Sequence, residues 1–208
     1  MENHIEGKKS VTAALFGNFF VTIIKTLVFF VTGSTSMFAE AVHSFADTLN
    51  QSLLLIGIRR SRKPADNARG YGYGIERFFW SLISACGILF IGSGVVIYHS
   101  IETLIHGSVV APDFSFLSMT VLVIALVVEG ITLWYALREL RKKRKWSMEM
   151  FEDADPIVLA IVYEDSVAVV GVFIALMAQW LTHITGNAVY DAVGGLLVGI
   201  VLGFLSVI

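Results

Sequence analysis

Three residues in the stretch AEAVHSFADTLNQ, positions 39–51, have the types and spacing of metal ligands. Glu40, His43 and Asp47 share one face if the segment is a helix. At the (i, i+4) spacing, the Cβ atoms of His43 and Asp47 would lie about 5–6 Å apart. An imidazole nitrogen and a carboxylate oxygen so placed suit one divalent metal, and they favour zinc or another late transition metal over magnesium or calcium. The stretch therefore predicts part of a metal site.

The rest of the chain is strongly apolar. Of its 208 residues, 56% are hydrophobic and 15% are charged, whereas a soluble domain carries about a quarter charged residues. Runs of about 20 apolar residues are the mark of helices that cross a membrane, and they are too long for barrel strands. Six such runs occur, at 11–31, 37–58, 78–98, 114–137, 157–181 and 188–208. We therefore predict an all-α membrane protein with an N-terminal tail, 1–10, and a six-helix transmembrane domain, 11–208.

The positions of the positive charges predict the topology. All fifteen Lys and Arg except Lys25 lie in the N-terminal tail or in the connections 59–77 and 138–156. The other three connections have none. By the positive-inside rule, both termini are then cytoplasmic. The basic cluster RKKRK at 141–145 would anchor this topology and contact anionic lipid headgroups.

Two local patterns predict details of the helices. Asp155 followed by Pro156 is typical of a helix start, so the fifth helix is expected to begin near 156. Gly195, Gly199 and Gly203 repeat at every fourth position, which predicts close packing of the sixth helix against its neighbours.

Other acidic residues are expected at membrane depth. At about 1.5 Å per helical residue, Asp47 lies about 18 Å above the inner edge of the membrane, and Glu129 and Asp165 lie about 14 Å above it. Glu164 adjoins Asp165. These carboxylates have few cations to pair with, so protons or an exchangeable cation must compensate them. The alternative is a polar face stabilised by hydrogen bonds between helices.

Lys25 and Glu40 are both expected in the outer part of the membrane, in the first and second helices. Because they lie in the same outer part of neighbouring spans, a structural ion pair between them is expected, with a role in transport as the alternative.

In order and position, these stretches resemble the cation diffusion facilitator family of metal exporters. The stretch SMFAEAVHSFADTLNQSLLLIG is similar to its second helix, with His43 and Asp47 on the H-x-x-x-D metal pair. The stretches YGYGIERF, GNFFVTIIK with Asn18, and YDAVGGLLVGI are similar to other helices of the family. EDSVAVVGV and ITGNAVYD most resemble its zinc transporter nine branch.

The resemblance implies a homodimer that exports a divalent metal from the cytosol by alternating access, usually in exchange for protons. The metal would bind between the second and fifth helices. Zn²⁺ is the expected substrate, with Fe²⁺, Co²⁺, Mn²⁺ and Cd²⁺ left open, and H⁺ is the expected coupling ion; no prosthetic group is expected. The family's usual cytoplasmic domain has no counterpart in these residues, and the chain is still apolar at Ile208, so a further C-terminal part stays an open question.

The fifth helix departs from the family pattern. That pattern is H-x-x-x-D or D-x-x-x-D, and with Asp165 on the final Asp the first position is Ile161, which cannot bind a metal. The fourth ligand is left open between Glu129, Glu164 after a helix rotation, Asn18 and water. The candidate metal ligands are thus His43, Asp47, Asp165, Glu164 and Glu129.

The predicted function is secondary active export of a divalent metal, with the lipid bilayer as surroundings and no nucleic-acid partner. In a bacterium, the protein would lie in the cell (inner) membrane. The alternatives are a passive metal channel, a structural protein that carries a metal, and an intramembrane metalloenzyme. Against an enzyme, the sequence has no H-E-x-x-H motif and no nucleophile–base pair at membrane depth.

Overall fold

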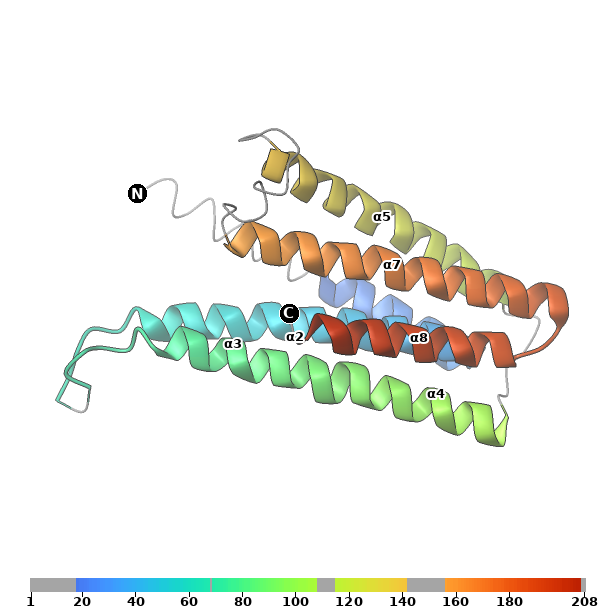
Figure 1. The fold of residues 1–208 in the computed structure, drawn as a ribbon, viewed down its shortest axis with the longest axis horizontal. Coiled ribbons are helices and arrows are strands. Elements are labelled where there is room, and N and C mark those ends of the chain that lie inside the picture. Colours follow the sequence, from blue (N-terminus) through green and yellow to red (C-terminus); the bar gives the residue numbers. More distant parts are fainter. Residues whose placement is uncertain (1–17, 68, 108–114, 142–155, 207–208) are drawn as a thin grey trace.

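The computed structural model describes residues 18–67, 69–107, 115–141 and 156–206, and most of these residues are helical. This confirms the predicted all-α, six-helix architecture. The helices are Asn18–Thr32, α2 (Thr35–Ser61), α3 (Glu76–Gly87) continued by the π-helical segment η1 (Ile88–Gly94) and α4 (Val95–His106), α5 (Ser115–Arg141), α7 (Pro156–Thr185) and α8 (Val189–Leu205) (Figure 1). The N-terminal tail 1–10 lies outside the described residues.

The helices differ in how well they suit a membrane. Within the described residues, three are long and apolar enough to span it by themselves: Glu76–His106, Phe116–Arg138 and Val162–Thr185. Two more, Asn18–Thr32 and Val189–Leu205, are apolar but shorter. The third predicted span, 78–98, is too short, because the apolar pattern continues through α4 to His106. Helix α2 is 27 residues long and is not among the spanning helices, in keeping with its polar residues.

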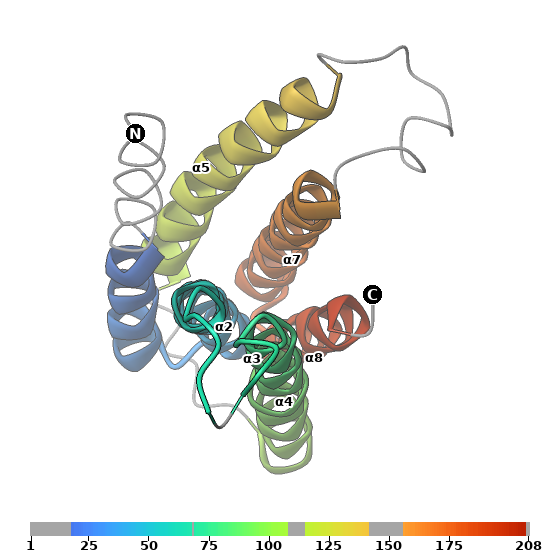
Figure 2. The same ribbon diagram turned by 90° about the vertical axis from the view of Figure 1, so that its left-hand side faces the viewer.

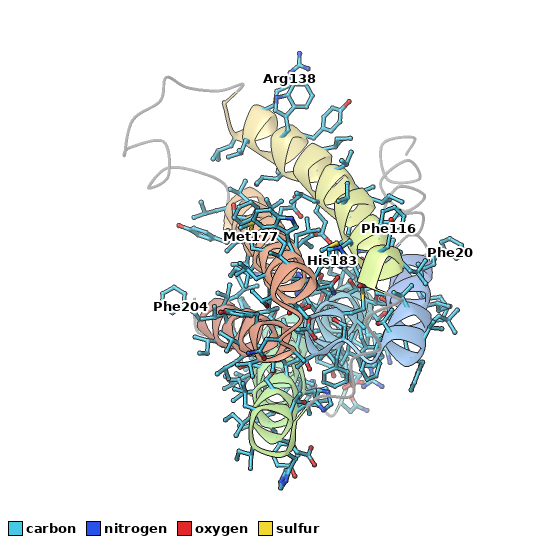
Figure 3. All side chains as sticks on the ribbon, turned by 90° about the vertical axis from the view of Figure 1, so that its right-hand side faces the viewer. Phe20, Phe116, Arg138, Met177, His183 and Phe204 are labelled. Atoms are coloured by element: carbon cyan, nitrogen blue, oxygen red, sulfur yellow. The ribbon has the colours of Figure 1, made fainter. Side chains whose placement is uncertain are left out.

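The outer surface of the bundle is apolar. Phe20 and Phe204, which point away from the helices in Figure 3, are 63% and 70% exposed. Exposed aromatic and aliphatic side chains occur on all the long helices. Such a surface would be a liability in water, whereas it matches lipid.

Helix α2 lies at the centre of the end-on view (Figure 2). On one side it meets the apolar cluster that includes Val28, Met37 and Leu122, from the first helix, α2 and α5, together with residues of α7. On the other side, Ala39 joins a second cluster formed with α4 and α8. Because apolar side chains on both sides hold α2, its polar face is enclosed by protein and not by lipid.

The glycines of α8 allow the close packing that the sequence predicts. A methyl group at Gly195 would lie 2.9 Å from Ser100 Oγ, and one at Gly199 would lie 2.9 Å from Val96. At Gly203 it would lie 2.6 Å from Ser93 Oγ. Side chains at these positions would push α8 away from η1, α4 and α2, so the stripe brings these helices together.

A polar cluster fixes the end of α2 that begins at Thr35. Asp191 of α8 accepts hydrogen bonds from Ser34 Oγ at 2.9 Å, from the Thr35 amide at 2.5 Å, and from the amide and hydroxyl of Ser36. Gln179 of α7 donates to Ser34 Oγ at 2.9 Å. The cluster satisfies the otherwise unpaired amides at the start of α2 and links it to α7 and α8.

Helix α7 begins at Pro156, as predicted from the sequence. Asp155, the predicted N-cap, lies outside the described residues, as does the basic cluster 141–145 from residue 142 onward. The topology, with both termini in the cytoplasm, stays a prediction.

Candidate metal centre

His43 and Asp47 form a pair on the polar face of α2. The distance from His43 Nε2 to Asp47 Oδ2 is 3.5 Å, as the (i, i+4) spacing on a helix permits. His43 is 2% exposed, and neither ring nitrogen has a hydrogen-bond partner. A buried imidazole without a hydrogen-bond partner is rare in a folded protein, and here the ring nitrogen that carries no proton can bind a cation or a further proton.

Two adjacent acidic residues of α7, Glu164 and Asp165, lie near this face of α2. Glu164 Oε1 accepts a hydrogen bond of 3.4 Å from Asn50 Nδ2, and Asn50 Oδ1 accepts one of 2.6 Å from Ser84 Oγ. The carboxylate of Asp47 interacts electrostatically with those of Glu164 and Asp165. Like charges so arranged repel one another unless a cation or protons lie between them.

The five predicted ligands are not gathered around one point in this conformation. Within the described parts of the chain, no three His, Cys, Asp or Glu side chains are close enough to hold one metal ion. The structure brings His43 and Asp47 together, and it places Glu164 against Asn50. The set of five ligands therefore stays a prediction that requires α2 and α7 to move closer. The side chain of Ile161 lies outside the described part.

Glu129 is engaged elsewhere. Lys25 Nζ lies 3.1 Å from Glu129 Oε1 and 2.9 Å from Glu40 Oε2, so one buried ammonium joins the first helix, α2 and α5. The predicted Lys25–Glu40 pair is confirmed. The contact with Glu129 was not predicted, because nothing in the sequence indicates that α5 lies against the first helix at this level.

Sequence reasoning also missed the roles of Asn50 and Ser84. Asn50 follows Asp47 at the (i, i+3) position, so it lies on the same face of α2. That spacing was the available signal for a residue that supports the centre. The Ser84 contact depends on the packing of α3 against α2 and has no local signal.

The arrangement is a buried imidazole–carboxylate pair with further carboxylates nearby, inside a helical bundle with an apolar surface. The chain matches the cation efflux transmembrane domain over residues 11–207, and it therefore belongs to the cation efflux family. The resemblance seen in the sequence is confirmed, and the protein is an integral membrane protein.

Three relatives illustrate this membership. The mitochondrial proton-coupled zinc antiporters SLC30A9 of Mus musculus and Homo sapiens are each 41% identical over 204 residues, which is 95% of this chain. Metal tolerance protein C4 of Arabidopsis thaliana is 36% identical over 210 residues, or 99% of this chain. The chain spans 35% of the length of the two antiporters and 46% of the length of the plant protein. The antiporters are named for transport and not for an enzymatic reaction.

Proposed function

We propose that this protein exports Zn²⁺ from the cytosol in exchange for protons. The observation that carries the proposal is His43, whose two unpartnered ring nitrogens are buried beside Asp47 on the central helix of a membrane bundle. A group of this kind would be destabilising as a purely structural element, because its polar atoms are desolvated without compensation. The names of the SLC30A9 relatives, proton-coupled zinc antiporters, support the same substrate and the same coupling ion.

The ligands would come from α2 and α7. His43 and Asp47 supply a nitrogen and an oxygen, and Asp165 or Glu164 would complete the site when α7 closes on α2. Three protein ligands and water are a common arrangement for exchangeable zinc. Glu129 would join only after it leaves Lys25. The same donors can accept Fe²⁺, Co²⁺ or Cd²⁺, whereas the imidazole disfavours Mn²⁺.

Protons couple to the metal through competition for the same atoms. A zinc ligand must be deprotonated, so each bound metal releases protons from imidazole or carboxylate groups. Histidine exchanges its proton near neutral pH, which is the range of physiological pH gradients. Exchange at one site in two alternating conformations would then be antiport.

The proposal includes a homodimer, which the family resemblance supports. It also includes cytoplasmic termini, which the distribution of positive charges supports.

Uptake of zinc into inside-out vesicles tests the function. With an acidic interior, wild-type protein should accumulate Zn²⁺ against its gradient, and an ionophore that collapses the pH difference should stop the uptake. His43→Ala should abolish it. If zinc enters equally well without a pH difference, the protein is a passive channel and the antiport proposal fails.

A further inference from the structure

A buried ion-pair cluster lies beside the metal centre, and two of its members, Lys25 and Glu40, have no part in the transport step described above. Lys25 contacts Glu40 at 2.9 Å and Glu129 at 3.1 Å, from three different helices. Lys25 and Glu40 are both 0% exposed. When all three groups are ionised, two carboxylates face one ammonium, so one negative charge is left over. An uncompensated charge at this depth is costly.

Each carboxylate of this cluster has one oxygen without a partner. Lys25 binds Glu40 Oε2 and Glu129 Oε1, while Glu40 Oε1 and Glu129 Oε2 are buried and accept no hydrogen bond. A purely structural ion-pair cluster normally satisfies its buried oxygens. The excess charge and the free acceptors together indicate that a cation visits this place.

Glu40 and His43 form a second ligand pair on α2. They are spaced (i, i+3), so they lie on one face of the helix, and Asp47 follows on the same face. Glu-x-x-His pairs that project into a helical bundle bind metals in other proteins. The sequence Glu40–His43–Asp47 therefore contains two overlapping pairs that share the imidazole.

The free oxygen of Glu40 faces α7. A methyl group at Gly171 would lie 3.1 Å from Glu40 Oε1, which makes this oxygen the nearest atom to that position. The absence of a side chain at Gly171 thus leaves space directly in front of the oxygen. Along α7, Gly171 lies farther from Pro156 than Asp165 does. Along α2, Glu40 likewise lies farther from Asp47 than His43 does.

We propose that Glu40 Oε1 and His43 form a second cation subsite, which receives the divalent metal from the His43–Asp47 pair on its way outward. This inference rests on the proposed export function. Lys25 is a positioning residue, because it holds Glu40 by its other oxygen, and Glu129 in turn holds Lys25. Only two protein ligands and a nearby ammonium make binding weak. Weak binding at successive sites is what allows an ion to enter and still leave.

Replacing the carboxylate by a thiol tests the subsite through metal preference. Glu40→Cys, reconstituted in liposomes, should transport Zn²⁺ at least tenfold more slowly than wild type. Its ratio of Cd²⁺ to Zn²⁺ transport should rise at least fivefold, because a soft thiolate prefers the softer metal. Ala41→Cys is the matched control, since it places a thiol at the same depth on another face of α2, and its ratio should stay within twofold of wild type. Equal ratios for the two variants overturn the proposal.

A second variant keeps every charge in place. Gly171→Ala fills the space before Glu40 Oε1 and should slow Zn²⁺ transport at least fivefold, while zinc binding to the purified protein, measured by calorimetry, stays within twofold. Gly87→Ala is its control, because a methyl group there lies 3.9 Å from Leu49, an ordinary contact. Unchanged transport in Gly171→Ala overturns the subsite, even if Glu40→Cys does not fold. An equal loss of zinc binding in Gly171→Ala also overturns the subsite, because it would show that the methyl group acts on the His43–Asp47 site.

The proposed function and the subsite fail in different ways. If wild-type protein shows no gradient-driven zinc transport, the function itself is wrong. If wild type transports, Asp47→Ala does not, and both Glu40→Cys and Gly171→Ala behave as their controls, only the subsite is rejected.

Discussion

At the scale of single residues, His43 is the most informative side chain. It is almost fully buried, it lies 3.5 Å from a carboxylate, and it makes no hydrogen bond through either nitrogen. Lys25 shows the opposite behaviour, because its ammonium is bound by two carboxylates. The ammonium of Lys25 is therefore paired within the protein, whereas the imidazole of His43 has no hydrogen-bond partner there.

The zinc affinity of the purified protein should depend on His43 and on pH. His43→Ala should lower the affinity more than tenfold, since it removes a ligand and not merely a supporting group. Wild-type affinity should be lower at pH 5.5 than at pH 7.5, because protons compete with the metal for the imidazole nitrogen and the carboxylate oxygens. Calorimetric titrations at pH 7.5 and 5.5 measure both effects.

Ser52→Ala is a suitable control for this titration. The Ser52 hydroxyl donates only to the carbonyl of Thr48, within α2 itself. The zinc affinity of the Ser52→Ala variant, and the dependence of that affinity on pH, should match those of wild type. A wild-type affinity that does not change with pH would contradict the assignment of His43 as a ligand.

At the scale of helices, two contacts set the position of α2. Asp191 accepts hydrogen bonds from the first residues of α2, in addition to the N-cap that Ser34 Oγ forms with the Met37 amide. The glycine stripe brings α8 against the neighbouring helices. Because α2 carries both His43 and Asp47, these remote contacts determine where the metal pair lies in the bundle.

Gly199→Ala should destabilise the protein by about 1–3 kcal/mol, because overpacking a close helix contact costs energy of that order. The added methyl group would lie 2.9 Å from Val96 and 3.3 Å from the backbone nitrogen of Ile97. Thermal unfolding in detergent measures the effect. Gly130→Ala has nothing within 4 Å of its methyl group and should be neutral or slightly stabilising. Equal melting temperatures for the two variants would show that α8 has room to move.

At the scale of the whole molecule, the bundle combines an apolar exterior with a row of ionisable groups inside. Helices α5 and α7 pack together, and α2 packs mainly on α3 and α8 (Figures 1 and 2). Helix α7 also packs extensively on α8, whereas its direct contact with α2 is much smaller. A movement of α7 relative to α2 is the simplest way to assemble and open the metal site.

The orientation in the membrane can be tested with single cysteines. Cys86 is the protein's one native cysteine, so Cys86→Ser gives a thiol-free background. In that background, Ala65→Cys should react with a membrane-impermeant maleimide only from the cytoplasmic side, and Asn187→Cys only from the opposite side. Both positions are exposed. Labelling of Ala65→Cys from outside would invert the predicted topology and the direction of transport with it.

The sequence by itself determined the features that depend on neighbours along one helix or on composition. The apolar runs established the helical membrane class, and the (i, i+4) spacing of His43 and Asp47 established their proximity, because helical periodicity fixes both. The positions of Lys25 and Glu40, both in the outer part of their helices, were enough to predict their ion pair.

Only the tertiary structure decided which helices meet. The binding of Glu129 to Lys25, the hydrogen bonds of Asp191 at the start of α2 and the approach of Gly171 to Glu40 each join different helices. Helical periodicity says which face a residue occupies, but it does not say which helix lies against that face. For the same reason the sequence could propose Asp165 and Glu164 as ligands from α7, while their distance from His43 depends on how closely α7 packs on α2.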